Sequence, residues 1–231
     1  MYEMSSDVVG YGVSAQANDG TLVELLRRLP ATTEVELVQR EIDPGSSVLD
    51  LGAGVGRIAN PLAKLGYRVT AVDDSAALLD EVRGARTVCA RIEELELGQR
   101  FDAVLLASSL INYPGTELRR AVLATVAGHL KPAGKALIQW RSPSWFASMQ
   151  QGGGHRFVDG PLTRTMDVKS DRDGVLEGTV SFELDGQLWR QPVRAQRLTC
   201  AQIQDELHSA GMQLETSEPE KAEWLVASPH R

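Results

Sequence analysis

The chain has 231 residues, 42% of them hydrophobic, and this length suits one domain with an elaboration better than two independent domains. Its formal charge of -7 at pH 7 argues against nucleic acid as a partner, because that binding needs clustered Lys and Arg side chains. The sequence shows neither a long uninterrupted apolar run nor a basic start followed by an apolar stretch. We therefore expect a cytoplasmic protein with no nucleic-acid or membrane partner.

Two helices are predicted ahead of the first strand. The residue pairs with the spacing of a capping box are Thr21 with Glu24 and Thr33 with Glu36. We expect residues 1–44 to form an N-terminal helical lid segment.

The middle of the chain, residues 45–140, alternates apolar runs of strand length with amphipathic helical stretches. This alternation predicts parallel strands joined by helical crossovers. The strand candidates, each too apolar to face water on either side, are Ser47–Asp50, Arg68–Val72, Thr87–Ala90, Phe101–Ala107 and Lys135–Trp140. The expected helices are Gly56–Leu65, a stretch capped by Ser75 that continues to Val82, and Thr116 to about Leu130, followed by a turn at Lys131–Gly134. Residues 45–140 are thus expected to form an α/β core.

After Trp140 the pattern changes. A loop is predicted from Arg141 to Pro161, and three β-rich runs follow without helices between them, at Arg164–Ser170, Val175–Leu184 and Gln187–Leu198. Asp173-Gly174 and Asp185-Gly186 are typical hairpin turns. We expect residues 141–198 to form an inserted loop and antiparallel β cap.

The last segment, residues 199–231, is predicted to complete the core sheet. Thr199 can cap a helix that ends at Gly211. Two final strands are expected near Gln213–Thr216 and Glu223–Ala227.

The segment most informative about function is Val48–Gly56, in which a buried strand leads into Gly52, Gly54 and Gly56. Glycines let a ligand approach the backbone closely, and the amides at a following helix start favour an anionic or dipolar group. A dinucleotide fingerprint would require a small residue where this chain has Arg57. Asp50, at the end of the strand, needs a donor, which either a bound ammonium or backbone amides could supply.

This segment resembles motif I of the class I S-adenosylmethionine-dependent methyltransferases, in which a hydrophobic strand is followed by an acid and G-x-G-x-G. Three later segments also resemble the family: Val69–Asp73, Phe101–Leu106 and Leu130–Gly134. The resemblance covers about residues 45–140. It implies an α/β, Rossmann-like, seven-stranded and mostly parallel sheet with helices on both faces and the last strand antiparallel. The small antiparallel β cap would be inserted after strand five.

The resemblance also implies which residues bind the cofactor. Asp50 and the glycines would hold its methionine end, and Asp73, with Asp74 beside it, would accept hydrogen bonds from the ribose hydroxyls. Where the family often has Gly-Asp-Ala at the adenine, this chain has Ala90-Arg91-Ile92-Glu93. Arg91, Ile92 and Glu93 are the candidates there, with a plain surface turn as the alternative. The remaining candidates are Ala107, Ser108 and the N-terminal Tyr11.

Candidates for catalysis follow from the position of the acceptor. Asn112 and Tyr113 would line the cleft after strand four and orient the acceptor, or else act as a capping Asn and a packed Tyr. His155, in the predicted Gly-rich loop, is the candidate general base, with a simple exposed loop residue as the alternative. Methyl transfer itself requires mainly alignment and exclusion of water.

The expected function is methyl transfer from S-adenosyl-L-methionine to oxygen or nitrogen of a small-molecule acceptor such as a secondary metabolite, with S-adenosyl-L-homocysteine as product and no metal. The protein is expected to be a monomer or homodimer. Two alternatives remain open: an S-adenosylmethionine-binding protein or isomerase or cyclase without methyl transfer, and an NAD-dependent oxidoreductase.

Overall fold

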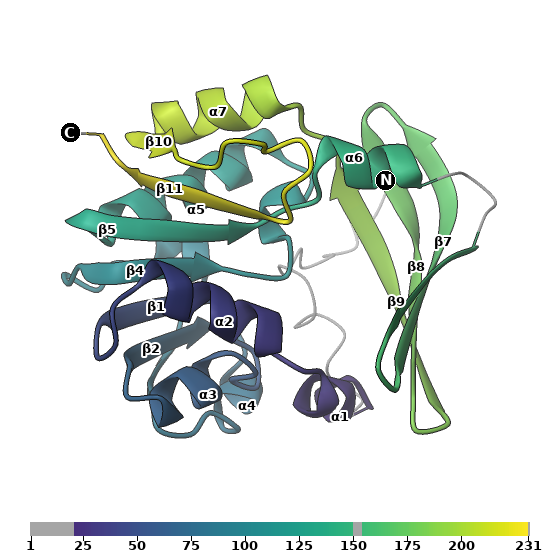
Figure 1. Cartoon of the computed structure of the whole chain (residues 1–231), viewed down its shortest axis with the longest axis horizontal. Coiled ribbons are helices and arrows are strands. Elements are labelled where there is room, and N and C mark those ends of the chain that lie inside the picture. Colours follow the sequence, from purple (N-terminus) through teal and green to yellow (C-terminus); the bar gives the residue numbers. More distant parts are fainter. Residues whose placement is uncertain (1–20, 150–153, 231) are drawn as a thin grey trace, which may run out of the picture.

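Two β-sheets and the helices around them make up the part of the chain described by the computed structural model, residues 21–149 and 154–230 (Figure 1). The strands of the core sheet are β1 (Ser47–Leu51), β2 (Arg68–Asp73), β3 (Arg86–Cys89), β4 (Phe101–Leu106), β5 (Leu130–Gln139), β10 (Met212–Leu214) and β11 (Trp224–Pro229). The strands of the cap sheet are β6 (Gly154–Asp159), β7 (Leu162–Arg172), β8 (Val175–Leu184) and β9 (Gln187–Gln196). The α-helices are α1 (Thr21–Arg28), α2 (Thr32–Glu41), α3 (Ala59–Lys64), α4 (Ala76–Leu79), α5 (Thr116–Gly128), α6 (Pro143–Ser148) and α7 (Cys200–Ser209).

The core sheet has the order β10-β11-β5-β4-β1-β2-β3. Strands β1 to β5 are parallel where they pair, and β11 is antiparallel to β5. Because a parallel sheet is covered by helices on both faces, its central strands are mostly apolar, and β1 is buried at every position. The expected seven-stranded, mostly parallel α/β fold is confirmed.

Helices cover both faces of the core sheet (Figure 1). Alternate residues of β1 point to opposite faces, so Val48 belongs to the apolar cluster of α2 and α3, whereas Leu49 belongs to the cluster of α5 and α7. The carboxyl ends of β1, β2 and β4 therefore meet at one edge of the sheet, where open α/β sheets bind ligands.

The cap sheet is a meander of four antiparallel strands beside the core sheet (Figure 1). Its two predicted hairpin turns have left-handed backbone at both central residues, with φ of 53° and 74° at Asp173-Gly174 and 51° and 77° at Asp185-Gly186. These values fit the turn type that matches the twist of paired strands. Helix α6 connects the cap to β5, and α1 packs against the cap through Leu25.

Part of the cap was predicted wrongly. The loop expected from Arg141 to Pro161 contains α6 and the fourth cap strand, β6. The Ser142 hydroxyl accepts from the Trp145 amide and caps α6, whose Pro143 stands at the first position. Strand β6 is an edge strand whose residues are mostly exposed, so its sequence lacks the apolar alternation that identifies a half-buried strand.

Two predictions within the core are also corrected. Strand β3 is largely exposed, because it lies at the sheet edge and pairs with β2 alone. The turn predicted at Lys131–Gly134 is an irregular part of β5, where the register with β4 shifts. A Cβ at Gly134 would lie 2.9 Å from the Phe101 carbonyl oxygen, so the close approach of β5 to β4 at this position requires glycine.

The predicted helix boundaries also change. Helix α3 begins at Ala59 and not at Gly56, and α4 ends at Leu79. The second capping box does not form, since α2 has Ala31 at its N-cap and no side-chain cap. The Thr199 cap is confirmed, with a complete capping box to Gln202. Among the helices in the described part of the chain, none is long and apolar enough to cross a membrane.

Candidate cofactor site

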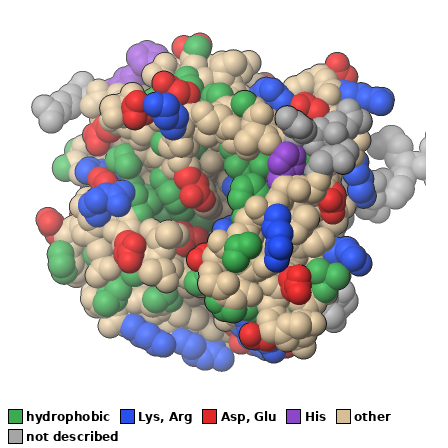
Figure 2. Space-filling view, turned by 45° about the vertical axis from the view of Figure 1, so that its right-hand side comes forward, with side chains coloured by type: hydrophobic (Ala, Val, Ile, Leu, Met, Phe, Trp, Pro, Cys, Tyr) green, Lys and Arg blue, Asp and Glu red, His purple; other side chains and the backbone are tan. Residues whose placement is uncertain are grey.

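A pocket opens at the carboxyl ends of β1, β2 and β4, and Figure 2 shows a hollow on this side of the molecule bordered by hydrophobic and acidic side chains. The residues predicted to bind a cofactor that line it are Asp50, Gly52, Gly54, Asp73, Asp74, Arg91, Ile92, Ala107 and Ser108. Gly56 and Glu93 are not among its lining residues. Tyr11 lies outside the described residues.

The glycine loop forms the floor of this pocket. Gly52, Gly54 and Gly56 all have positive φ, at 74°, 54° and 78°. A Cβ at Gly52 would lie 2.9 Å from Leu110 Cδ1, and one at Gly56 would lie 2.7 Å from Asn60 Oδ1. The tight turn after β1 therefore depends on glycine for both its backbone conformation and its space.

Asp50 is an unpaired buried acid at the end of β1. Its side chain is only 1% exposed, and its Oδ2 has no hydrogen-bond partner among the described residues. Burial raises its pKa to about 7, Arg57 opposes this increase, and Asp73 and Glu34 add to it. A buried carboxylate without a donor is costly, so the site fits a cationic ligand group that approaches this oxygen. Backbone amides, the other donor expected from the sequence, do not reach Oδ2 within residues 21–149 and 154–230.

Asp73 ends β2 and holds the glycine loop in place. Its Oδ2 accepts from the Gly54 amide at 2.8 Å, and its Oδ1 accepts from the Ser75 amide at 3.0 Å. Burial nevertheless raises its pKa. Because each carboxylate oxygen can accept a further hydrogen bond, Asp73 retains the capacity to bind hydroxyl groups in the pocket. Its neighbour Asp74 is exposed and also lines the pocket.

The segment after β3 forms one wall. The Arg91 guanidinium pairs with the Glu93 carboxylate, with a distance of 2.7 Å from Nε to Oε1. Ile92 is buried in the pocket wall, and its carbonyl accepts from the Thr125 hydroxyl at 2.9 Å. The structure thus brings Arg91 and Ile92 to the pocket, whereas Glu93 is placed behind them as the partner of Arg91.

The loop after β4 forms the opposite wall and carries unusual backbone. Ser108 and Ser109 have φ of 58° and 55°, a left-handed conformation that is uncommon for residues other than glycine. The Ser108 amide donates to Gln139 Oε1 at 2.7 Å, which holds the turn against β5. Such outliers concentrate at ligand sites, and here Ser108 lines the pocket beside Ala107.

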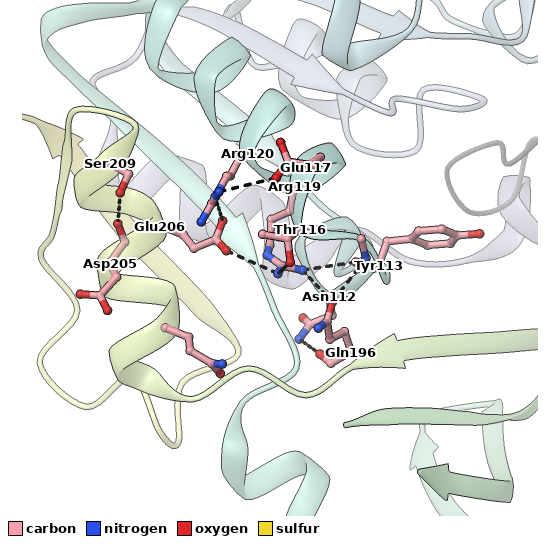
Figure 3. A network of polar contacts seen from close by, with 12 residues as sticks. Asn112, Tyr113, Thr116, Glu117, Arg119, Arg120, Gln196, Asp205, Glu206 and Ser209 are labelled. Carbon is pink, nitrogen blue, oxygen red and sulfur yellow. Dashed lines mark hydrogen bonds and ion pairs between the residues drawn. The ribbon is translucent and has the colours of Figure 1, made fainter. Parts of the chain in front are cut away.

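The three candidates for catalysis lie outside the pocket lining. Asn112 is 1% exposed, and its side-chain amide binds the backbone of Arg141 and the carbonyl of Gln196. This arrangement fits a structural role that joins core and cap. Figure 3 shows the ring of Tyr113 pointing away from this polar network. His155 lies in β6, paired with Met166, and not in the predicted loop.

Some residues that line the pocket were not predicted from the sequence. Leu26 of α1 and Leu78 of α4 line it, although nothing in their local sequence distinguishes them from core leucines. Arg57 also lines it, forming an ion pair with Glu34 at 2.8 Å and donating to the Pro30 carbonyl oxygen at 2.6 Å. Arg57 thereby ties the glycine loop to the N-terminal helices.

Parts of this chain are similar in sequence to known methyltransferases. Residues 48–134 match the model of the methyltransferase domain family. The cypemycin N-terminal methyltransferase of Streptomyces sp is 34% identical over 141 residues, covering 56% of this chain and 57% of that protein. The ubiquinone biosynthesis O-methyltransferase of Bradyrhizobium sp. (strain ORS 278) is 32% identical over 109 residues, covering 44% and 42%. The chain thus spans 42% to 57% of the length of these relatives.

Solved structures share the fold over nearly the whole chain. The CcbJ methyltransferase from Streptomyces caelestis has a TM-score of 0.70 at 19% identity and covers 91% of this chain and 96% of its own. The sugar N-methyltransferase KedS8 from Streptoalloteichus sp ATCC 53650 has a TM-score of 0.68 at 18% identity, covering 100% and 98%. Residues 48–134 therefore resemble a methyltransferase domain, and the chain as a whole has the fold of these solved methyltransferase structures.

Proposed function

We propose that this chain is an S-adenosylmethionine-dependent methyltransferase acting on oxygen or nitrogen of a small-molecule acceptor, with a secondary metabolite as the acceptor class. The observation that carries the proposal is the buried Asp50 carboxylate, whose Oδ2 has no partner in the described chain, beside a glycine loop at the carboxyl edge of the sheet. One relative is named an N-terminal methyltransferase and the other an O-methyltransferase, so the acceptor atom stays open.

The pocket residues fit the cofactor chemically. Asp50 offers an acceptor to the ammonium of the methionine part, Asp73 offers acceptors to the ribose hydroxyls, and Arg91 with Ile92 forms the wall for the adenine. When bound, the cofactor supplies an electrophilic methyl group on a sulfonium centre.

The chain's own contribution is alignment and exclusion of water. The apolar side chains of Leu26, Leu78 and Leu110 line the pocket together with the rigid turn at Ser108. A general base is required only for an acceptor that must lose a proton, and the described pocket lining contains no histidine. His155 of the cap sheet is retained as the candidate base in this proposal.

The decisive experiment has two parts. Calorimetry with S-adenosylhomocysteine should show binding, and NAD should not compete. Mass spectrometry of acceptor libraries incubated with the protein and S-adenosylmethionine should then reveal a product heavier by one methyl group. Binding of NAD in place of S-adenosylhomocysteine would reject the proposal, and binding without turnover would favour a cofactor-binding protein or an isomerase.

Replacing Asp73 with Ala should weaken S-adenosylhomocysteine binding by about 1–3 kcal/mol, since hydrogen bonds to both ribose hydroxyls would be lost. The measurement is calorimetric affinity, with Asp80→Ala on the exposed end of α4 as the control of equal charge change. Unchanged affinity in Asp73→Ala would show that the ribose is held elsewhere.

The proposal also includes a cytoplasmic location and a monomeric or homodimeric state. Light scattering coupled to gel filtration tests the second of these, because a trimer or larger assembly would contradict it.

A further inference from the structure

Two arginines between the core and the cap have no carboxylate within ion-pair distance in the part of the chain that the structure describes. Arg141 lies two residues after the end of β5, at the carboxyl edge of the core sheet, and Arg164 lies in β7 of the cap. Across residues 21–149 and 154–230, neither guanidinium forms a hydrogen bond or an ion pair, and the Arg164 Nε is buried without a partner.

The position of Arg164 follows from its strand. Leu162 and Met166, two residues to either side, point to the same face of β7 and are buried, Leu162 in a cluster with Leu25 of α1 and Met166 in a cluster with Phe146 of α6. Arg164 therefore points from the inner face of the cap toward the core, between two packed apolar clusters. Its cross-strand neighbours on this face are Phe157 and Phe182.

Arg141 faces Arg164 from the core. Its guanidinium carbon lies 4.9 Å from the ring centroid of Trp145, and Trp145 packs against the cluster that contains Met166. Burial lowers the pKa of Arg141, Glu223 opposes this, and the positive charge of Arg164 lowers the pKa further. Glu223, the acid that acts on the pKa of Arg141, accepts a hydrogen bond from Gln139 Nε2 at 2.7 Å.

Two other arginines of this region are neutralised by carboxylates of the protein itself. Arg194 pairs with Glu177 at 2.9 Å, and Arg197 pairs with Asp171. A chain with a net charge of -7 has many carboxylates, yet among the described residues none forms an ion pair with Arg141 or Arg164. Two guanidiniums that repel each other in a partly buried place are stabilised by an anion between them.

We propose that Arg141 and Arg164 form an anion subsite of the acceptor site, and that the acceptor carries a carboxylate or phosphate group held between them. This inference rests on the proposed methyltransferase function. Asn112 is a positioning residue in this arrangement, because its side-chain oxygen accepts from the Arg141 amide at 2.6 Å and its amide group donates to the Arg141 carbonyl oxygen at 3.3 Å. The aromatic side chains of Trp145, Phe157 and Phe182 provide apolar surface beside the subsite.

The test is calorimetry on the full chain saturated with S-adenosylhomocysteine, using benzoate, its neutral analogue benzamide, and inorganic phosphate as probes. Benzoate or phosphate should bind at least about tenfold more tightly than benzamide, and Arg141→Met and Arg164→Met should each weaken that binding at least about tenfold. Arg190→Met, on the outer face of the same cap sheet, is the matched control and should bind like the wild type.

The outcomes separate the two proposals. Equal affinity for benzoate and benzamide, no anion binding by the wild type, or full binding by both Arg141→Met and Arg164→Met would overturn the subsite while leaving the methyltransferase proposal intact. Failure of S-adenosylhomocysteine to bind the wild type would instead reject the proposed function. The relative affinities of benzoate and phosphate decide between a carboxylate and a phosphate.

Discussion

The variant Asp50→Asn is expected to be more stable than the wild type at pH 8 in the absence of cofactor, by up to about 4 kcal/mol in the free energy of unfolding. Asp50 is fully buried, and burial raises its pKa from 3.8 to about 7. Above about pH 7 the folded wild type must keep a charged carboxylate in a buried site. The amide of Asn has the same shape and carries no charge, so it removes this cost.

The sign of the pH dependence follows from the two pKa values. Between about pH 4 and pH 7, the unfolded chain releases the Asp50 proton while the folded chain retains it. Asp50 therefore does not change the free energy of unfolding well below pH 4. It lowers that free energy progressively as the pH rises, and by the full amount above pH 7. The difference between Asp50→Asn and wild type should decrease accordingly as the pH falls toward 4. The charged groups that act on Asp50 are Arg57, Asp73 and Glu34.

Urea denaturation of both proteins at several pH values measures this difference. The exposed Asp80→Asn is the control, and its stability should follow the wild type at every pH. The same Asp50→Asn variant should bind S-adenosylhomocysteine more weakly, because the ammonium loses a charged acceptor. An Asp50→Asn protein with wild-type stability at pH 8 would show that Asp50 is satisfied in the cofactor-free protein.

The parts of the fold that were predictable from sequence are those with local physical causes. The glycine loop follows from Gly52, Gly54 and Gly56, whose positive φ values other residues adopt only at a cost. The central strands follow from continuous apolar runs that only a sheet covered on both faces can bury. Position at the end of a strand was also enough to bring Asp50 and Asp73 into one pocket.

What was missed depends on contacts between distant segments. The ion pair of Arg57 with Glu34 joins residues whose proximity only the packing of α2 creates. Strand β6 has few apolar residues to reveal it, because it is an edge strand held by the backbone of β7. The facing of Arg141 and Arg164 likewise depends on how the cap is placed over the core, which no local pattern encodes.

Arg119→Met is expected to lower the free energy of unfolding by about 3–5 kcal/mol, because Arg119 is at the centre of the buried polar network between α5, α7 and the end of β9 (Figure 3). Arg119 is only 5% exposed. Its guanidinium donates to Gln196 Oε1 at 3.1 Å and lies 3.5 Å from Glu206 Oε1. Methionine fills much of the same volume but leaves the Glu206 carboxylate buried beside apolar atoms.

The neighbouring Arg120→Met is the matched control. Arg120 is 58% exposed on the same helix and reaches Glu117 and Glu206 only at 3.6 and 3.9 Å, so its replacement should change stability by less than about 1 kcal/mol. The double variant Arg119→Met with Glu206→Met removes both charges and should recover much of the loss, since a buried pair replaced by apolar residues is often neutral. Urea denaturation compares the three variants. If Arg119→Met were as stable as Arg120→Met, the cost of desolvating the Arg119–Glu206 pair would cancel the attraction between the two charges. The contact between core and cap would then depend on apolar packing and on Asn112.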